Sequence, residues 1–149
     1  MWNDNKSLVL SKVFVVLFMV LLVVCLIFAP RIVERLLSRS FLAYQAGAVY
    51  FLLTIYLSSI PAGTVLVSLF LLLKNISSDE VFVRENIVLL RYISWGFFLG
   101  GIIGTLSAIY YAPWLPIGIA AAFMGLVVRV VKNVIAKAVS LQDEANYTI

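Results

Sequence analysis

Four long apolar runs, each almost free of charge, constrain this chain more than any other feature of its sequence. They cover about residues 10–29, 43–73, 92–111 and 115–131. A helix rises about 1.5 Å per residue, so about 20 residues cross a hydrocarbon core of about 30 Å. Each run is therefore long enough to span a membrane, and residues 132–149 are expected to form a helical tail outside it.

Lipid offers no hydrogen-bond partners to a peptide backbone, so a spanning segment must be a helix or a strand of a closed barrel. Barrel strands alternate polar and apolar residues, whereas these runs are unbroken. The sequence predicts an all-α fold, a four-helix transmembrane bundle that forms one integral-membrane domain over residues 1–149.

Composition excludes several other classes of protein. Hydrophobic residues make up 64% of the chain and charged residues 12%, with a mean hydropathy of +1.11. In average globular chains, hydrophobic residues make up about 45–50% and charged residues about 25%. A water-soluble domain of this size could not hide that much apolar surface. A soluble enzyme, a disordered tail and a disulfide-stapled secreted domain are excluded, and the single cysteine, Cys25, cannot form an internal disulfide.

Orientation follows from the basic residues, which give the chain a net charge of +4. With both termini inside, eight of the 11 Lys and Arg residues lie in the cytoplasm, and Arg31, Arg35 and Arg39 lie outside. That bias predicts an N-in, C-in protein of the bacterial cytoplasmic membrane. The scattered cations suit contact with lipid headgroups, and no direct binding of nucleic acid is expected.

The first run is followed by a proline and the second contains one, and each proline bears on how its run crosses the membrane. Residues 13–29 could serve as a secretory signal, but Pro30 after Ala29 makes a poor cleavage site, so an uncleaved first span is expected. The second run is too long for one straight span, and it holds Pro61 near its middle. Proline removes a backbone hydrogen bond, which predicts a kink or break near Ser58. The alternative is a tilted helix with projecting ends.

Two connectors are expected to be structured as short interfacial helices. Apolar and charged side chains divide between two sides of a helix over residues 31–41, which predicts an amphipathic helix in the outer interface. A capping-box pattern from Ser77 to Glu80 precedes residues 81–91. This pattern predicts that residues 81–91 form a cytoplasmic helix close to the membrane. The alternative is that they form a plain extension of the third span.

Small residues at every fourth position form a stripe in the third span, which favours close approach of another helix. The stripe comprises Gly96, Gly100, Gly104 and Ala108. Ala121 and Gly125 in the fourth span provide an internal match. Packing inside the chain is expected, and contact with a second copy in a homo-oligomer is the alternative.

The sequence contains few residues of the types that usually carry out catalysis. The chain has no histidine, which removes most zinc sites and Ser-His-Asp triads. Its spans carry no charge in their middles, whereas such charges usually mark pumps and proton-coupled carriers. We expect no catalytic residue, no cofactor and no metal, and we expect that the protein is not an enzyme.

An apolar seam continues along the fourth span and beyond it with heptad-like spacing. Its members are Val127, Val131, Val134, Ala138 and Leu141. One interpretation is that the emerging helix packs on residues 81–91. The other is that the seam forms a cytoplasmic docking surface for a partner.

Two blocks of sequence resemble a known family. They read VFVRENIVLLRYI from Val81 to Ile93 and LQDEANYTI from Leu141 to Ile149. They are similar to the "VF…EN…LR.I" block and the "LQEEND.TI" ending of the YoaS-like bacterial family of small four-span membrane proteins, a domain of unknown function. The chain departs from that ending at Ala145 and Asn146, where the family tends toward Asn-Asp. Members are often encoded beside a small helix-turn-helix regulator.

The resemblance implies a non-enzymatic regulatory or interaction protein that binds a cytoplasmic partner such as a helix-turn-helix regulator. The predicted partner face comprises Phe82, Arg84, Glu85, Asn86, Arg91, Leu141, Gln142 and Glu144. One alternative is a bacteriocin-immunity or envelope-stress protein that works through residues 31–41 and 110–114. The other is a transporter or channel subunit, which only the break expected in the second span supports.

Overall fold

The computed structural model describes residues 3–148, and within that range the chain is 89% helical and has no strands. The helices are α1 (Asp4–Arg39), α2 (Phe41–Ala46), α3 (Ala48–Ser77), α4 (Arg84–Ser107) and α5 (Trp114–Tyr147). The predicted all-α fold is confirmed. Ile149, the last residue of the predicted tail, lies outside the described residues.

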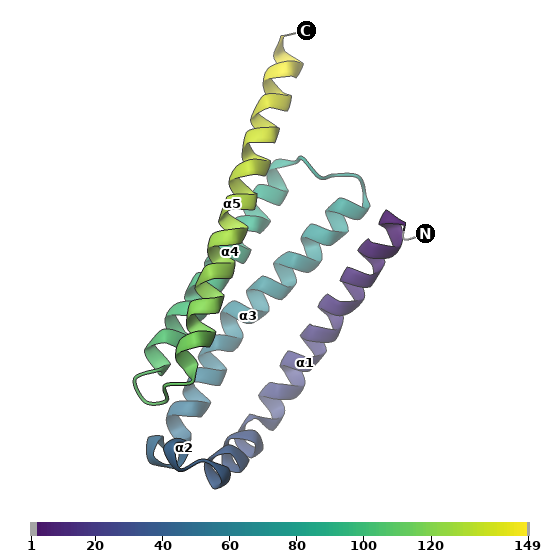
Figure 1. The fold of residues 1–149 in the computed structure, drawn as a ribbon. Helices are drawn as coiled ribbons and strands as arrows, with labels where there is room; N and C mark the ends of the chain where they lie inside the picture. The colour runs from purple at the N-terminus through teal and green to yellow at the C-terminus, as the bar shows by residue number, and fades with distance from the viewer. Residues whose placement is uncertain (1–2, 149) are drawn as a thin grey trace.

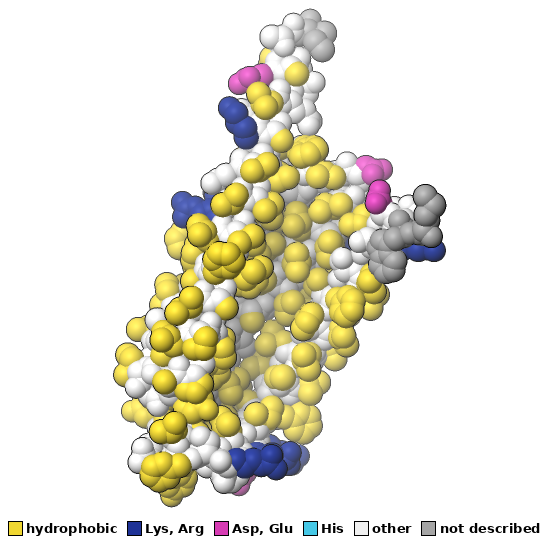
Figure 2. Space-filling view, in the orientation of Figure 1, with side chains coloured by type: hydrophobic (Ala, Val, Ile, Leu, Met, Phe, Trp, Pro, Cys, Tyr) yellow, Lys and Arg dark blue, Asp and Glu magenta, His cyan; other side chains and the backbone are white. Residues whose placement is uncertain are grey.

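Helices α1, α3, α4 and α5 are each long and apolar enough to cross a membrane. Hydrophobic side chains cover most of the face seen in Figure 2, and charged side chains gather toward its ends. Many large apolar side chains are exposed along the helices, Ile27 and Ile60 among them. Such a surface suits lipid as the solvent, and the chain is a multi-pass membrane protein.

The long helices pack in chain order, α1 on α3, α3 on α4 and α4 on α5 (Figure 1). Both ends of the described chain and the α3–α4 connector lie at one end of the molecule, which we call the terminal end. Helix α2 and the α4–α5 connector lie at the opposite end. Four crossings therefore bring both termini to the same side of the membrane.

The first connector differs from the prediction. Residues 31–39 are helical, but they belong to α1, which continues through Pro30 to Arg39. Proline has no N–H, so the carbonyl of Leu26 loses its partner within the helix. The hydroxyl of Tyr56 on α3 donates a hydrogen bond of 3.3 Å to that carbonyl. A neighbouring helix thus satisfies the freed group, and the helix does not need to end.

The second apolar run is divided at Gly47, between α2 and α3, rather than near Ser58. Gly47 has a φ of 87°, which a residue with a side chain rarely adopts. Helix α3 then continues without a break through Pro61. The prediction of a break near Ser58 is therefore wrong, whereas a kink within the continuous helix stays a prediction. The sequence support for a transporter or channel subunit, which needed the break, disappears with it.

The capping box predicted in the second connector is also wrong. Ser77 is the last residue of α3, and its hydroxyl donates to the carbonyl of Leu73 at 2.9 Å. Helix α4 begins at Arg84 and runs unbroken to Ser107. No separate helix covers residues 81–91, so the alternative of a plain extension is correct from Arg84 onward.

Glycines allow α4 to approach α5 closely. A Cβ added to Gly101 would lie 2.9 Å from the carbonyl oxygen of Gly118. One added to Gly104 would lie 2.9 Å from the Cα of Gly118. Further along, a Cβ on Gly125 would lie 3.1 Å from the carbonyl oxygen of Ser94. The two helices thus pack at backbone distance, which maximises van der Waals contact where the hydrophobic effect does not drive association.

The predicted stripe is therefore not a single groove. A Cβ on Gly96 would meet Val65 of α3, and a Cβ on Gly100 would meet no atom within 4 Å. The prediction that Gly100 lies in a packing groove is wrong, since Gly101 takes that place. Ala108 follows the end of α4, and Ala121 is half-buried, while Ala122 beside it meets Gly101.

Adjacent glycines on α4 provide a matched test of this contact. We expect Gly101→Ala to lower the free energy of unfolding by about 1–3 kcal/mol, because its Cβ would overlap α5. Gly100→Ala should leave stability unchanged or slightly raised, since its Cβ position is open. Thermal unfolding of both variants in detergent micelles measures the difference. Equal destabilisation of both variants would contradict the finding that α4 turns Gly101, and not Gly100, toward α5.

Candidate interaction surface

Three clusters of polar and aromatic side chains lie at the two ends of the spanning helices. Among residues 3–148, no three His, Cys, Asp or Glu side chains lie close enough together to hold a metal ion.

An apolar and aromatic cap closes the opposite end. Val33 of α1, Ala43 of α2 and Phe51 of α3 are buried together there. The rings of Tyr110, Tyr111 and Trp114 lie around the ring of Phe51, with centroids 5.1 to 6.5 Å away. Around one aromatic side chain, the cap thus joins α1, α2 and α3 to the α4–α5 connector and the start of α5.

A network of hydroxyl groups lies beside this cap. The hydroxyl of Thr54 on α3 lies 2.7 Å from that of Ser107 and 2.7 Å from that of Tyr110. The Tyr110 hydroxyl also lies 3.3 Å from the carbonyl oxygen of Tyr50. Buried hydroxyls need such partners in an apolar environment. The network fastens α3 to the end of α4 and to the connector that follows it.

Asn86 organises the α3–α4 connector at the terminal end. Its side chain is only 1% exposed. The amide nitrogen donates to the carbonyls of Glu80 and Val81, at 2.7 and 2.8 Å. The amide oxygen accepts from the side chain of Asn75, at 2.8 Å. This Asn86 clamp fixes residues 78–83 against the first turn of α4.

The tail of α5 continues beyond the other helices as a single rod (Figure 1). Well along the tail, Asp143 forms an ion pair with Arg84, the first residue of α4, with 3.1 Å between Nη2 and Oδ2. A groove of about 540 Å³ runs between the two helices there, lined in part by Ile87, Val88, Val139 and Tyr147. The ion pair is exposed, so it contributes little to stability, but it brings the connector and the tail together.

The residues of the predicted partner face do not all lie on one exposed surface. Phe82, Arg84, Glu85, Leu141, Gln142 and Glu144 are exposed at the terminal end. Asn86 is buried in its clamp, so its inclusion in a binding face is wrong. Arg91 is exposed but lines a different hollow between α4 and α5, together with Arg129 and Lys132.

The predicted apolar seam does not face α4. Of its five members, only Ala138 is half-buried, and Val134 and Leu141 are 63% and 53% exposed. Helix α5 uses another side, on which Val128, Ile135 and Val139 lie toward α3 and α4. The emerging helix therefore does pack on the start of α4, as one interpretation expected, but it does so through Ile135 and Val139. The seam itself takes no part and is left free in the described part of the chain.

Sequence reasoning missed the Asn86 clamp as a structural unit. Asn75 and Asn86 are the two amides that flank the short connector, and each stands next to apolar residues. An amide in an apolar setting needs hydrogen-bond partners, so a hydrogen bond between these two side chains could have been predicted. Nothing in the sequence indicated that the acceptors are the carbonyls of Glu80 and Val81.

Four apolar spans, a buried set of hydroxyls and amides, and charged groups at the ends define an α-helical integral-membrane protein. Within that class, a family model matches residues 38–149, and the family is described as a protein of unknown function, DUF2975. The chain belongs to this family. The match agrees with the expected uncharacterised family, while the YoaS-like resemblance stays a prediction.

The family match begins at Ser38, in the last turn of α1, and includes α2 through α5. These helices contain the α4–α5 glycine contact, the Asn86 clamp and the tail. No curated protein and no solved structure was found to match the chain.

Substitutions at Asn86 test the clamp. We expect Asn86→Ala to lower the free energy of unfolding by about 2–3 kcal/mol, because the carbonyls of Glu80 and Val81 lose their donor. Protease cleavage within residues 78–83 should become faster, measured on the protein in detergent micelles. Asn86→Asp should behave similarly, since a carboxylate accepts hydrogen bonds but does not donate them.

Asn133→Ala is the matched control, since Asn133 is exposed on α5. Its stability and its cleavage rate should equal those of the unmodified protein. A clamp without structural importance would leave both Asn86 variants as resistant to protease as this control.

Proposed function

We propose that this chain is a non-enzymatic protein of the bacterial cytoplasmic membrane that binds a soluble regulatory partner through its terminal end. The observation that carries this proposal is the tail of α5. The tail bears exposed apolar side chains on a segment that lies beyond the spanning helices, where lipid does not cover them.

The tail extends well past the predicted fourth span. Helix α5 continues for 16 residues after Val131, the end of the predicted fourth span, to Tyr147. At about 1.5 Å per residue the extension measures about 24 Å. It carries Lys137, Asp143 and Glu144, whose charges favour water over hydrocarbon.

Exposed apolar side chains also occur on this segment outside the predicted spans. Val134, Leu141 and Tyr147 are all exposed on the tail, and Phe82 is exposed in the neighbouring connector. Exposed apolar side chains that recur along one water-solvated helix are typical of a protein-binding surface. A partner helix laid along the tail would cover Val134 and Leu141, which are two helical turns apart.

The contact between connector and tail further supports one composite surface. Arg84 and Asp143 join α4 to the tail, and the groove between the helices continues past Val139 to Tyr147. A partner that docks here would contact both elements together. The resemblance of the same two blocks to the YoaS-like family favours a helix-turn-helix regulator as this partner.

The proposal requires the terminal end to lie in the cytoplasm, as the distribution of basic residues predicts. In a Cys25→Ser background, we expect Ala112→Cys, in the α4–α5 connector, to react with a membrane-impermeant maleimide on intact cells. Ser78→Cys, in the α3–α4 connector, should react only after the membrane is permeabilised. Both positions are exposed, so accessibility to the reagent reports the side of the membrane. The reverse pattern would place the tail outside the cell and exclude a cytoplasmic partner.

Photo-cross-linking in cells tests the partner itself. A photoreactive amino acid placed at Phe82 or Leu141 should form an adduct with a soluble protein that contains a helix-turn-helix domain. Matched positions at the opposite end, Phe41 and Ile109, are exposed apolar residues as well and should form no such adduct. Adducts of the same protein from both ends, or from neither, would contradict the proposal.

A further inference from the structure

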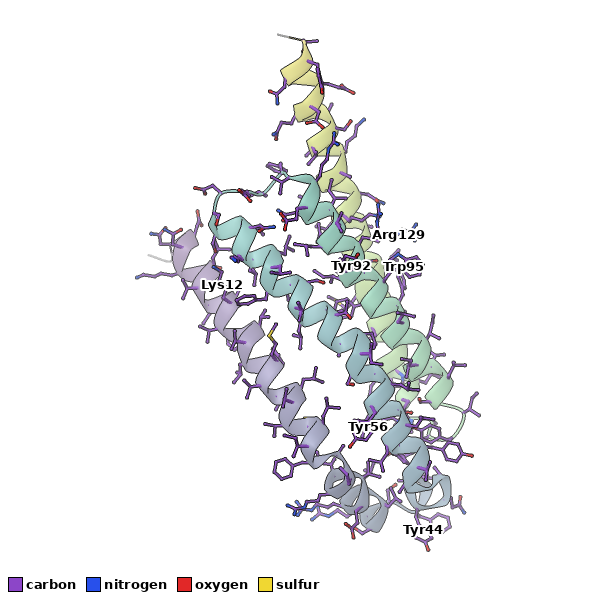
Figure 3. All side chains as sticks on the ribbon, turned by 180° about the vertical axis from the view of Figure 1, so that it is seen from behind. Lys12, Tyr44, Tyr56, Tyr92, Trp95 and Arg129 are labelled. Carbon is purple, nitrogen blue, oxygen red and sulfur yellow. The ribbon has the colours of Figure 1, made fainter. Side chains whose placement is uncertain are left out.

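A positively charged hollow of about 200 Å³ lies between α4 and α5 near the terminal end. It is lined by Arg91, Ser94, Trp95, Phe98, Arg129 and Lys132. In the structure seen from behind, the labelled Trp95 and Arg129 lie near each other beside α4 and α5 (Figure 3). Neither the packing of the helices nor the proposed partner surface accounts for this cluster of cations.

The glycine contact explains why the hollow forms at this height. Residues 91, 94, 95 and 98 lie on one side of α4, and Arg129 and Lys132 are nearly one turn apart on α5. Just inside the hollow, Gly125 lets the helices touch, and the hydroxyl of Ser94 donates to the Gly125 carbonyl at 2.9 Å. That contact closes the inner end, and the long side chains beyond it surround an open space.

The hollow contains three positive charges and no acidic side chain. Within residues 3–148 the structure has one ion pair, between Arg84 and Asp143, so none of these three cations has an acidic partner there. Like charges that converge on one space repel each other, most strongly where water is partly excluded. An anion in the hollow would relieve this repulsion, and arginine is well suited to hold a phosphate through paired N–H donors.

The height of the hollow indicates the source of that phosphate. Arg91 comes directly before the third apolar run, and Arg129 lies near the end of the fourth. Trp95 is 58% exposed at the same level, and tryptophan prefers the boundary between headgroups and acyl chains. Exposed Leu99 and Ile102 continue along α4 into the spanning region. A phosphate at this level would therefore have apolar surface below it for two acyl chains.

We propose that this hollow binds the phosphate group of an anionic phospholipid, with Arg91, Arg129 and Lys132 as its ligands. Basic pockets between spanning helices are suited to anionic lipid headgroups. The phosphate bridges α4 and α5 at the base of the tail. This site assigns Arg91 to a lipid rather than to a protein partner, and it does not depend on the proposed partner.

Lipid titration of the full-length protein in neutral detergent micelles tests this site. Native mass spectrometry should show a retained phosphatidylglycerol molecule, with phosphatidylcholine bound more weakly. Replacement of Arg91, Arg129 and Lys132 by glutamine should weaken binding of phosphatidylglycerol roughly 100-fold. The matched control replaces Arg31, Arg35 and Arg39 by glutamine at the opposite end, which removes the same charge and should leave this binding close to that of the unmodified protein.

A less disruptive pair keeps the test decisive if the triple variant does not fold. Arg129→Gln should weaken binding about tenfold, whereas Lys137→Gln on the tail of the same helix should not. Equal weakening by both members of either pair would indicate unspecific attraction to a basic protein and overturn the proposal. Inorganic phosphate that displaces the lipid at equal concentration would also overturn it, because the site would then recognise a soluble anion.

Discussion

The hydrocarbon core of a membrane supplies no water to the peptide backbone, and most of this structure follows from that constraint. Each spanning segment must form its own hydrogen bonds, so the four apolar runs are helices. The same constraint explains the treatment of Pro30, whose missing N–H leaves a carbonyl that Tyr56 of the next helix satisfies. It also explains the hydroxyl network around Thr54, since buried hydroxyls must bond to one another when water is absent.

Without a hydrophobic drive between helices, close contact has to hold them together. Helix α4 uses glycine on two sides for this purpose, Gly96 toward α3 and Gly101 and Gly104 toward α5. Gly118 on α5 meets the second side at backbone distance. The middle helix of the family-matched segment therefore contacts both neighbours through positions without a side chain, while the first helix, α1, packs mainly on α3 among the long helices.

The terminal end concentrates the features that remain available for interaction. The Asn86 clamp holds the connector, the Arg84–Asp143 pair links it to the tail, and the basic hollow lies at the base of that tail. A protein partner on the tail and a lipid phosphate in the hollow would use different side chains of the same two helices. Both surfaces depend on the α4–α5 contact, because Gly118 and Gly125 bring the two helices together at backbone distance.

The sequence by itself determined the number of spans, their helical nature and the common side of both termini, because these follow from lengths of apolar residues and from backbone chemistry. Connector details were misjudged, since Ser77 ends α3 with its hydroxyl bonded to the carbonyl of Leu73, and α3 continues unbroken through Ser58. Only the tertiary structure decided that Gly101 rather than Gly100 meets α5, and that the seam through Leu141 is free. The physical reason is helix rotation: adjacent residues point about 100° apart, and only packing against a neighbour selects which of them faces it.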